Sequence, residues 1–170
     1  MISLSCGRRN HCGRGRSVLL YVLLTTVIWL LDRFSKILVV KRFPLWSSRP
    51  LIDHWLLLTH VRNTGAAFGL FQNQALLLSL VAVGLLLAVY VFRGQISCLG
   101  LLGKTGLALI AGGALGNLYD RLTLGYVIDF LELPYWPVFN LADSCIVVGV
   151  GLLLLGIWNL DRRDRQSVHS

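Results

Sequence analysis

The chain has 170 residues, of which 55% are hydrophobic and only 14% are charged, and its formal net charge is +8. A soluble domain is roughly a quarter charged, so this composition excludes an ordinary soluble protein and indicates an integral membrane protein. Most basic residues lie beside apolar runs, as the positive-inside rule predicts. We therefore expect anionic lipid headgroups, and no nucleic acid, as the acidic partner.

Four apolar segments are long enough to cross a membrane, since about 20 helical residues span the hydrocarbon core. They lie at about residues 17–36, 75–92, 99–118 and 141–160. We predict that residues 17–160 form a single four-span domain.

Polar segments flank and separate these spans. Residues 1–16 are rich in arginine and predict a disordered cytoplasmic arm, and residues 161–170 predict a cytoplasmic tail. Residues 41–70 combine prolines with a strand-like stretch, so they predict a small extramembrane element with a few strands. Residues 119–139 predict a second surface loop.

An even number of spans places both termini on the same side of the membrane. That side carries nine of the sixteen basic residues, namely Arg8, Arg9, Arg14, Arg16, Arg93, Lys104, Arg162, Arg163 and Arg165. Because basic residues concentrate in cytoplasmic segments, we predict that both termini are cytoplasmic.

The cysteines do not have the spacing of a metal site. Cys6, Cys12, Cys98 and Cys145 form no CxxC pair, and no histidine pair lies near them. This spacing argues against zinc.

With this topology, the unusual polar residues fall on the outer face, near the ends of the spans. These residues are Asp32, Asn63, Asn117, Asp120, Asn140 and Asp143. Acids within a membrane protein's apolar segments are costly and are functional candidates by default. Asp129 lies between Ile128 and Phe130 with no adjacent cation, so it is the hardest acid to explain structurally. We hypothesise that Asp129 and Asp143 form a pair that shares one proton and activates a water molecule.

Several of these residues also have a structural interpretation. Asn140 and Asp143 have the spacing of a helix N-cap with an acid in the first turn. Asp120 and Arg121 are adjacent and are placed for a local ion pair. The Gly112–Gly116 spacing is typical of close helix packing. The residues alone leave these alternatives open.

Five short runs, taken in order, resemble the bacterial lipoprotein signal peptidase family, also called signal peptidase II. The runs are Asp32-Arg33-Phe34-Ser35-Lys36, Asn63-Thr64-Gly65-Ala66-Ala67-Phe68, Gly112-Gly113-Ala114-Leu115-Gly116-Asn117-Leu118-Tyr119-Asp120-Arg121, Gly125-Tyr126-Val127-Ile128-Asp129-Phe130 and Phe139-Asn140-Leu141-Ala142-Asp143-Ser144. The resemblance extends from about residue 17 to residue 160.

The resemblance implies an aspartic endopeptidase of the bacterial cytoplasmic (inner) membrane. Such an enzyme removes the signal peptide from a prolipoprotein, immediately before a cysteine that carries diacylglycerol. The implied fold is an all-α membrane protein with four transmembrane helices, a periplasmic β-cradle at roughly residues 41–62 and a periplasmic loop, residues 119–139, over the site. No metal or organic cofactor is implied. We expect a monomer whose partners are the prolipoprotein substrate and membrane lipid.

The family's two catalytic aspartates match Asp129 and Asp143, and Asp120 is the main rival to Asp129. The resemblance implies that the other matching positions bind substrate or support the catalytic pair. These positions are Asp32, Asn63, Gly113, Asn117, Asp120, Arg121 and Asn140.

Two other functional classes are compatible with intramembrane acids. In an ion-coupled carrier such acids bind protons or cations, but carriers place them near the midplane and often contain inverted repeats. Here the acids lie at one interface and no internal repeat is evident. A non-catalytic assembly factor would use the glycine-rich third span for packing, and it leaves Asp129 and Asn63 unexplained.

Overall fold

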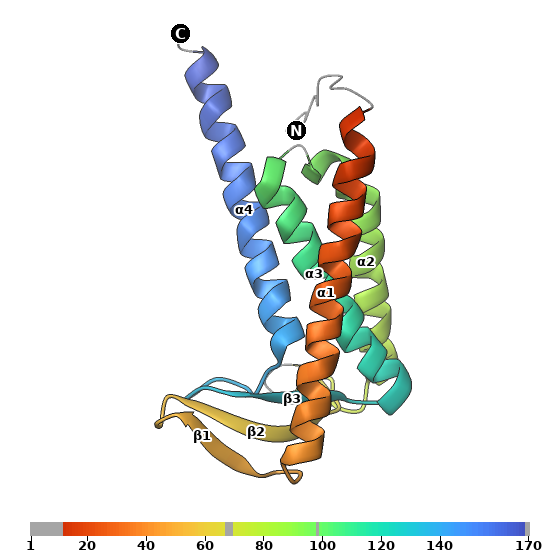
Figure 1. Cartoon of the computed structure of the whole chain (residues 1–170), viewed down its shortest axis with the longest axis vertical. Coiled ribbons are helices and arrows are strands. Elements are labelled where there is room, and N and C mark those ends of the chain that lie inside the picture. Colours follow the sequence, from red (N-terminus) through yellow and green to blue (C-terminus); the bar gives the residue numbers. More distant parts are fainter. Residues whose placement is uncertain (1–11, 67–69, 98, 169–170) are drawn as a thin grey trace.

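The computed structural model describes residues 12–66, 70–97 and 99–168, which form four long helices and a three-stranded sheet (Figure 1). The elements in chain order are α1 (Cys12–Arg42), β1 (Ser48–Ile52), β2 (Leu56–Asn63), α2 (Ala75–Ser97), α3 (Gly100–Leu124), β3 (Val127–Glu132) and α4 (Leu141–Val168).

The helices run side by side in alternating directions, and the sheet lies across one end of the bundle (Figure 1). The first turn of α1 and the last turn of α4 both lie at the opposite end. Helix α3 is central, because it packs against α1, α2 and α4 and contributes more buried apolar side chains than any other element described. Large apolar side chains such as Leu23, Leu80 and Leu154 are exposed on the surrounding helices, as expected for surfaces that face lipid.

Three helices are long and apolar enough to cross a membrane by length and composition. These segments are Ala75–Gly94, Gly100–Leu124 and Leu141–Arg162 among the described residues. Helix α1, which carries Asp32, Arg33 and Lys36, is not among these segments. The prediction of a mostly helical membrane protein with a small sheet is therefore confirmed, whereas the fourth span stays a prediction.

Glycines let α3 approach its neighbours closely. A Cβ added at Gly112 would lie 2.7 Å from the Ile28 side chain of α1, and one added at Gly113 would lie 2.4 Å from the Ala142 carbonyl of α4. Both distances are shorter than a van der Waals contact, so only glycine permits this packing. The packing interpretation of the Gly112–Gly116 spacing is confirmed.

The three strands form an antiparallel sheet in the order β1-β2-β3. Val61 of β2 lies opposite Asp129 of β3, and a register shift separates this part of the ladder from the pairing at Leu58. Gly125, with a φ of 79°, ends α3 in the left-handed conformation that favours glycine. Only Tyr126 separates Gly125 from the start of β3, so this tight reversal brings Asp129 to the end of the bundle.

The sheet corrects one sequence prediction. Residues 119–139 do not form a loop over the site, because α3 continues to Leu124 and residues 127–132 form the third strand. The residues from Val127 to Phe130 are all buried. A strand that is buried on both faces lacks the alternation of polar and apolar residues by which strands are recognised.

The ends of the bundle also differ from expectation. Helix α1 begins at Cys12, so residues 12–16 are helical rather than disordered, and residues 1–11 lie outside the described residues. Helix α1 ends shortly before Pro44, which disfavours helix in the residue that precedes it. Helix α4 continues to Val168 through the expected tail, where Arg165 pairs with Asp161 one turn earlier (2.9 Å).

Candidate active site

Asp129 is buried in β3, with only 2% of its surface exposed, and both carboxylate oxygens accept hydrogen bonds from amides. Asn63 Nδ2 donates to Oδ2 (2.8 Å), and Asn140 Nδ2 donates to Oδ1 (2.7 Å). Burial and, secondarily, the charge of Asp143 raise the pKa of Asp129 to about 7. A carboxyl group with this pKa exchanges protons near neutral pH.

Asp143 lies in the first turn of α4 and has two kinds of contact. It forms a reciprocal cap with Asn140: the Asp143 N–H donates to Asn140 Oδ1 (2.9 Å), and the Asn140 N–H donates to Asp143 Oδ2 (3.2 Å). The other carboxylate oxygen, Oδ1, accepts a hydrogen bond from Asn117 Nδ2 (2.7 Å). The capping interpretation is confirmed, and one oxygen of Asp143 is still directed toward the polar cluster.

Asn140 links the two aspartates. Its Nδ2 contacts Asp129, and its Oδ1 and backbone N–H contact Asp143. Asn140 is fully buried, so its amide is held by these contacts rather than by water. Two carboxyl groups held this close in a poorly solvated site favour a state with a single shared proton, which suits general acid–base chemistry.

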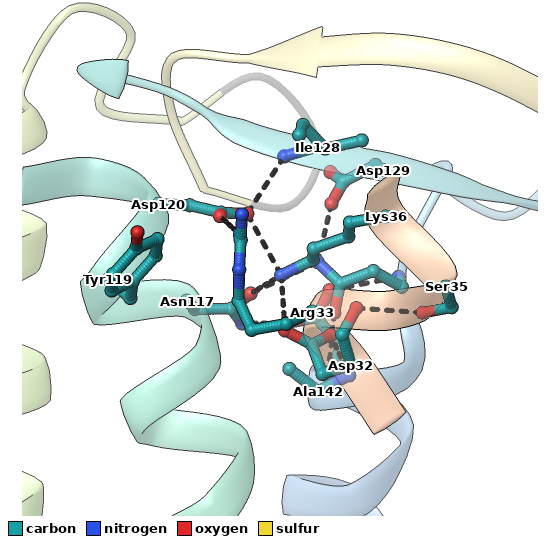
Figure 2. A network of polar contacts seen from close by, with 12 residues as sticks. Asp32, Arg33, Ser35, Lys36, Asn117, Tyr119, Asp120, Ile128, Asp129 and Ala142 are labelled. Atoms are coloured by element: carbon teal, nitrogen blue, oxygen red, sulfur yellow. Dashed lines mark hydrogen bonds and ion pairs between the residues drawn. The ribbon is translucent and has the colours of Figure 1, made fainter. Parts of the chain in front are cut away.

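Asp120 has a different environment, although its motif is equally prominent in the sequence (Figure 2). Its carboxylate pairs with Arg33 and with Lys36 Nζ (2.9 Å), and it accepts the Ile128 N–H (3.3 Å). Among the described residues, Arg121 forms no ion pair with Asp120. Its Nη2 donates to the Gly65 carbonyl instead (3.3 Å). The interpretation of Asp120 and Arg121 as a local ion pair is therefore wrong. Asp120 is a charge-paired link between α1, α3 and β3.

Asp32 connects α1 to the start of α4. Its Oδ1 accepts the Ala142 N–H (3.1 Å), one of the free donors in the first turn of α4, and its Oδ2 pairs with Lys36 (2.8 Å). A Cβ at Gly116 of α3 would lie 2.3 Å from this Oδ2. The glycine therefore leaves room for a carboxylate between the helices.

The structure brings most of the predicted residues into one network at the sheet end of the bundle. Seven polar side chains take part, namely Asp32, Asn63, Asn117, Asp120, Asp129, Asn140 and Asp143. Arg121 lies beside them and interacts electrostatically with three of the carboxylates. Gly113 contributes helix packing against Ala142.

Sequence reasoning did not place Arg33 or Lys36 in the site. Arg33 pairs with Asp120 and lies over the Tyr119 ring (4.4 Å from Cζ to the centroid). Lys36 is fully buried and pairs with Asp32, four residues earlier on α1. This four-residue spacing of opposite charges within an apolar helix is the signal that could have identified Lys36.

A cavity of about 440 Å³ opens beside Asp129. Its walls come from the turn before β1, from β2 and β3 and from the segments that follow these two strands, and they include Trp46, Arg62, Asn63 and Tyr135. Asp129 is one of the residues that line the cavity. Within the described residues, no three His, Cys, Asp or Glu side chains are placed to hold a metal ion.

Comparison with known proteins gives a consistent result. The family model for signal peptidase (SPase) II matches residues 24–159. A lipoprotein signal peptidase of Syntrophomonas wolfei subsp. wolfei is 50% identical over 145 residues, covering 83% of this chain and 95% of that protein. One from Desulfitobacterium hafniense is 42% identical over 142 residues, covering 83% and 94%.

The fold also matches a solved structure of a bacterial membrane enzyme. The TM-score is 0.77 at 27% sequence identity, and the match covers 82% of this chain and 88% of that one. The resemblance inferred from the five sequence runs is thus confirmed by both sequence and structure. The chain belongs to the signal peptidase II family.

Proposed function

We propose that the chain is an aspartic endopeptidase that removes signal peptides from prolipoproteins, cleaving before a diacylglyceryl-modified cysteine. Family membership supports the substrate class, because the similar proteins are lipoprotein signal peptidases. The observation that carries the proposed chemistry is the buried pair Asp129 and Asp143, linked by Asn140.

In the proposed reaction, the pair holds one proton and binds a water molecule between its carboxyl groups. The ionised carboxylate takes a proton from the water as the oxygen attacks the scissile carbonyl, and the protonated carboxyl donates to the carbonyl oxygen. The resulting tetrahedral intermediate then collapses, and a proton passes to the leaving amine. Because the two groups titrate as a coupled pair, the acid and base roles belong to the pair.

The amide hydrogen bonds around the pair support this chemistry. Asn63, Asn117 and Asn140 supply its hydrogen bonds, and an amide donor orients a carboxyl group without neutralising it. Asp120 is a weaker candidate, because Arg33, Lys36 and the Ile128 N–H already occupy its carboxylate.

We further propose four membrane spans, with both termini cytoplasmic and the sheet at the periplasmic face of a bacterial inner membrane. Helix α1 has 31 residues and is about 46 Å long at 1.5 Å per residue, which is sufficient to span the bilayer. Its first turn lies at the same end of the bundle as the last turn of α4, and its last turn lies at the end that carries the sheet (Figure 1). This arrangement keeps residues 17–160 as one domain, which we propose acts as a monomer.

The proposed substrate reaches the site from the lipid phase. The cavity beside Asp129 is at the end of the bundle, next to helices with exposed apolar surfaces. A diacylglyceryl group gains about 0.8 kcal/mol for each CH₂ that it buries, so its acyl chains contribute much of the affinity.

The test is cleavage of a diacylglyceryl-modified prolipoprotein by the purified full chain in lipid. Wild type is compared with Asp129→Asn, Asp143→Asn and Asp120→Asn at equal amounts of folded protein. We expect the first two substitutions to reduce cleavage by about 10²–10⁴-fold, the usual contribution of a general acid or base, and the third to retain activity.

Unchanged cleavage by either Asp129→Asn or Asp143→Asn would remove that residue from the mechanism. Failure of folded wild type to cleave, combined with proton flux across reconstituted vesicles, would favour a carrier instead.

A further inference from the structure

Lys36 carries a fully buried ammonium group. A buried charge is costly unless it is paired and hydrogen-bonded, and Lys36 Nζ has three partners. It lies 2.8 Å from Asp32 Oδ2, 2.9 Å from Asp120 Oδ2 and 3.1 Å from Asn117 Oδ1 (Figure 2). The contacts with the two carboxylates are ion pairs, and the ammonium donates a hydrogen bond to Asn117 Oδ1.

The third partner connects Lys36 to the proposed catalytic pair. An ammonium donates and cannot accept, so Lys36 requires the oxygen end of the Asn117 amide to face it. The nitrogen end then faces Asp143, where it donates to Oδ1 (2.7 Å). If the amide were reversed, an NH₂ group would face the ammonium, and an oxygen would face a carboxylate.

The same Asn117 oxygen also fixes Asn140. Asn140 Nδ2 donates to Asn117 Oδ1 (3.1 Å) and to Asp129 Oδ1 (2.7 Å). A chain of hydrogen bonds therefore runs from Lys36 through Asn117 to Asp143, and through Asn117 and Asn140 to Asp129. One buried cation on α1 orients groups on α3, α4 and β3.

We propose that Lys36 is a positioning residue for the aspartate pair, which acts by holding the Asn117 amide in one orientation and by placing a fixed positive charge behind the pair. The proposal rests on the proposed peptidase function. Lys36 does not contact the substrate. It determines the direction of the amides that hold the two carboxyl groups.

The charge of Lys36 acts on the pair together with the other ionisable groups around it. These groups are Asp32 and Arg33 on α1, Asp120 and Arg121 on α3, Asp129 on β3 and Asp143 on α4. The positive charge of Lys36 lowers the pKa of Asp129, opposing the larger effects of burial and of Asp143. Loss of Lys36 would raise that pKa, so the acidic limb of the rate profile would move to higher pH.

The main test is Lys36→Met, which keeps an apolar side chain of similar length and removes the charge and the donors. Because this change leaves Asp32 and Asp120 without their shared cation, a charge-balanced variant, Lys36→Met with Asp32→Asn, is measured beside it. Lys41→Met is the matched control, since Lys41 is an exposed lysine on the same helix. Cleavage of the diacylglyceryl prolipoprotein is measured as kcat and KM from pH 5 to pH 9.

We expect kcat to fall by about 10–100-fold in Lys36→Met and in the charge-balanced variant, because losing a hydrogen bond to a charged group has an effect of this size. KM should change by less than about twofold. In Lys36→Met the acidic limb of the kcat profile should move up by about one pH unit, the lower end of the effect of a nearby charge. In the charge-balanced variant the lost negative charge of Asp32 offsets part of this shift, so its kcat is the deciding measurement. Lys36→Arg, which keeps the charge in a different donor geometry, should keep the wild-type limb and recover only part of kcat.

A folded charge-balanced variant with wild-type kcat and pH profile would overturn the proposal and leave Lys36 as a structural ion-pair partner. Failure of folded wild type to cleave would overturn the peptidase function itself, and the Lys36 proposal with it. The two failures are distinguished by the wild-type and Asp129→Asn reactions, which do not involve any Lys36 substitution.

Discussion

Two adjacent clusters of carboxylates at the sheet end of the bundle differ in the groups that hold them. In the first, the charge-paired cluster, Asp32 and Asp120 meet Lys36 and Arg33. In the second, the amide-held cluster, Asp129 and Asp143 receive their side-chain hydrogen bonds from asparagines.

The difference shows how one protein keeps aspartates for two purposes. The ion pairs of the first cluster connect helices, whereas in the second cluster burial and the neighbouring Asp143 raise the pKa of Asp129 against the opposing effect of its amide hydrogen bonds. The pKa of Asp129 is about 7. Asp129, in the amide-held cluster, is therefore suited to exchanging protons near neutral pH.

The largest expected contrast is in stability. Asp120→Ala would leave Lys36 and Arg33 without a shared partner, and we expect it to destabilise the protein by about 3–5 kcal/mol, as for breaking a buried ion pair. Asp129→Asn removes a desolvated carboxyl but places an NH₂ group against one of its two amide donors, and we expect a smaller loss of about 1–3 kcal/mol, as for one unsatisfied buried group. Unfolding in lipid–detergent mixtures measures both changes. Equal losses in the two variants would remove the distinction between the clusters.

A second substitution separates the contact of residue 117 with Lys36 from its hydrogen bond to Asp143. Asn117→Asp keeps an oxygen for Lys36 but replaces the donor to Asp143 with an acceptor. We expect kcat to fall by about 10–100-fold, the value of a hydrogen bond to a charged group, while the protein remains folded. The measurement is kcat and KM with an unfolding curve for the same preparation. Wild-type kcat in this variant would show that the Asn117 donor is dispensable.

A substitution at Gly116 tests the close packing that leaves room for the charge-paired cluster. In Gly116→Ala the new methyl group would lie 2.3 Å from Asp32 Oδ2, and we expect a loss of about 1–3 kcal/mol, typical of overpacking. Gly151→Ala is the matched control, because a Cβ at this helical glycine meets nothing within 4 Å. Thermal unfolding of both variants measures the difference, and a control that loses as much stability as Gly116→Ala would refute this explanation.

The smallest expected effect, taken per pH unit, is the pH dependence of stability that Asp129 contributes. An unfolded aspartate has a pKa of about 3.9, and the folded pKa is about 7, so between these values the folded state holds a proton that the unfolded state lacks. This contribution is fully present below about pH 4 and is lost as pH rises through 7, by at most about 1.4 kcal/mol per pH unit. Asp129→Asn should remove that slope. Parallel stability curves for wild type and variant from pH 4 to pH 7 would contradict the assignment.

The sequence predicted the elements whose signals are local. Apolar runs located the cores of α2, α3 and α4, and the turn signals between residues 41 and 70 indicated the strands of the first hairpin. It did not reveal β3, because a strand buried on both faces has no alternating pattern. Helix α1 continues beyond the predicted end of the first span near Lys36 to Arg42, and the position where the span itself ends stays a prediction.

The sequence by itself determined which residue types are present and that asparagines and aspartates gather near the ends of the helices. Asp120 was the main rival to Asp129 at that level, because it lies in an equally prominent motif. Only the tertiary structure decided their environments: α1 brings Lys36 and Arg33 to Asp120, and the pairing of β2 with β3 places Asp129 among amides. The physical reason is that the environment of a buried carboxyl depends on side chains distant in sequence, which only packing brings within hydrogen-bonding distance.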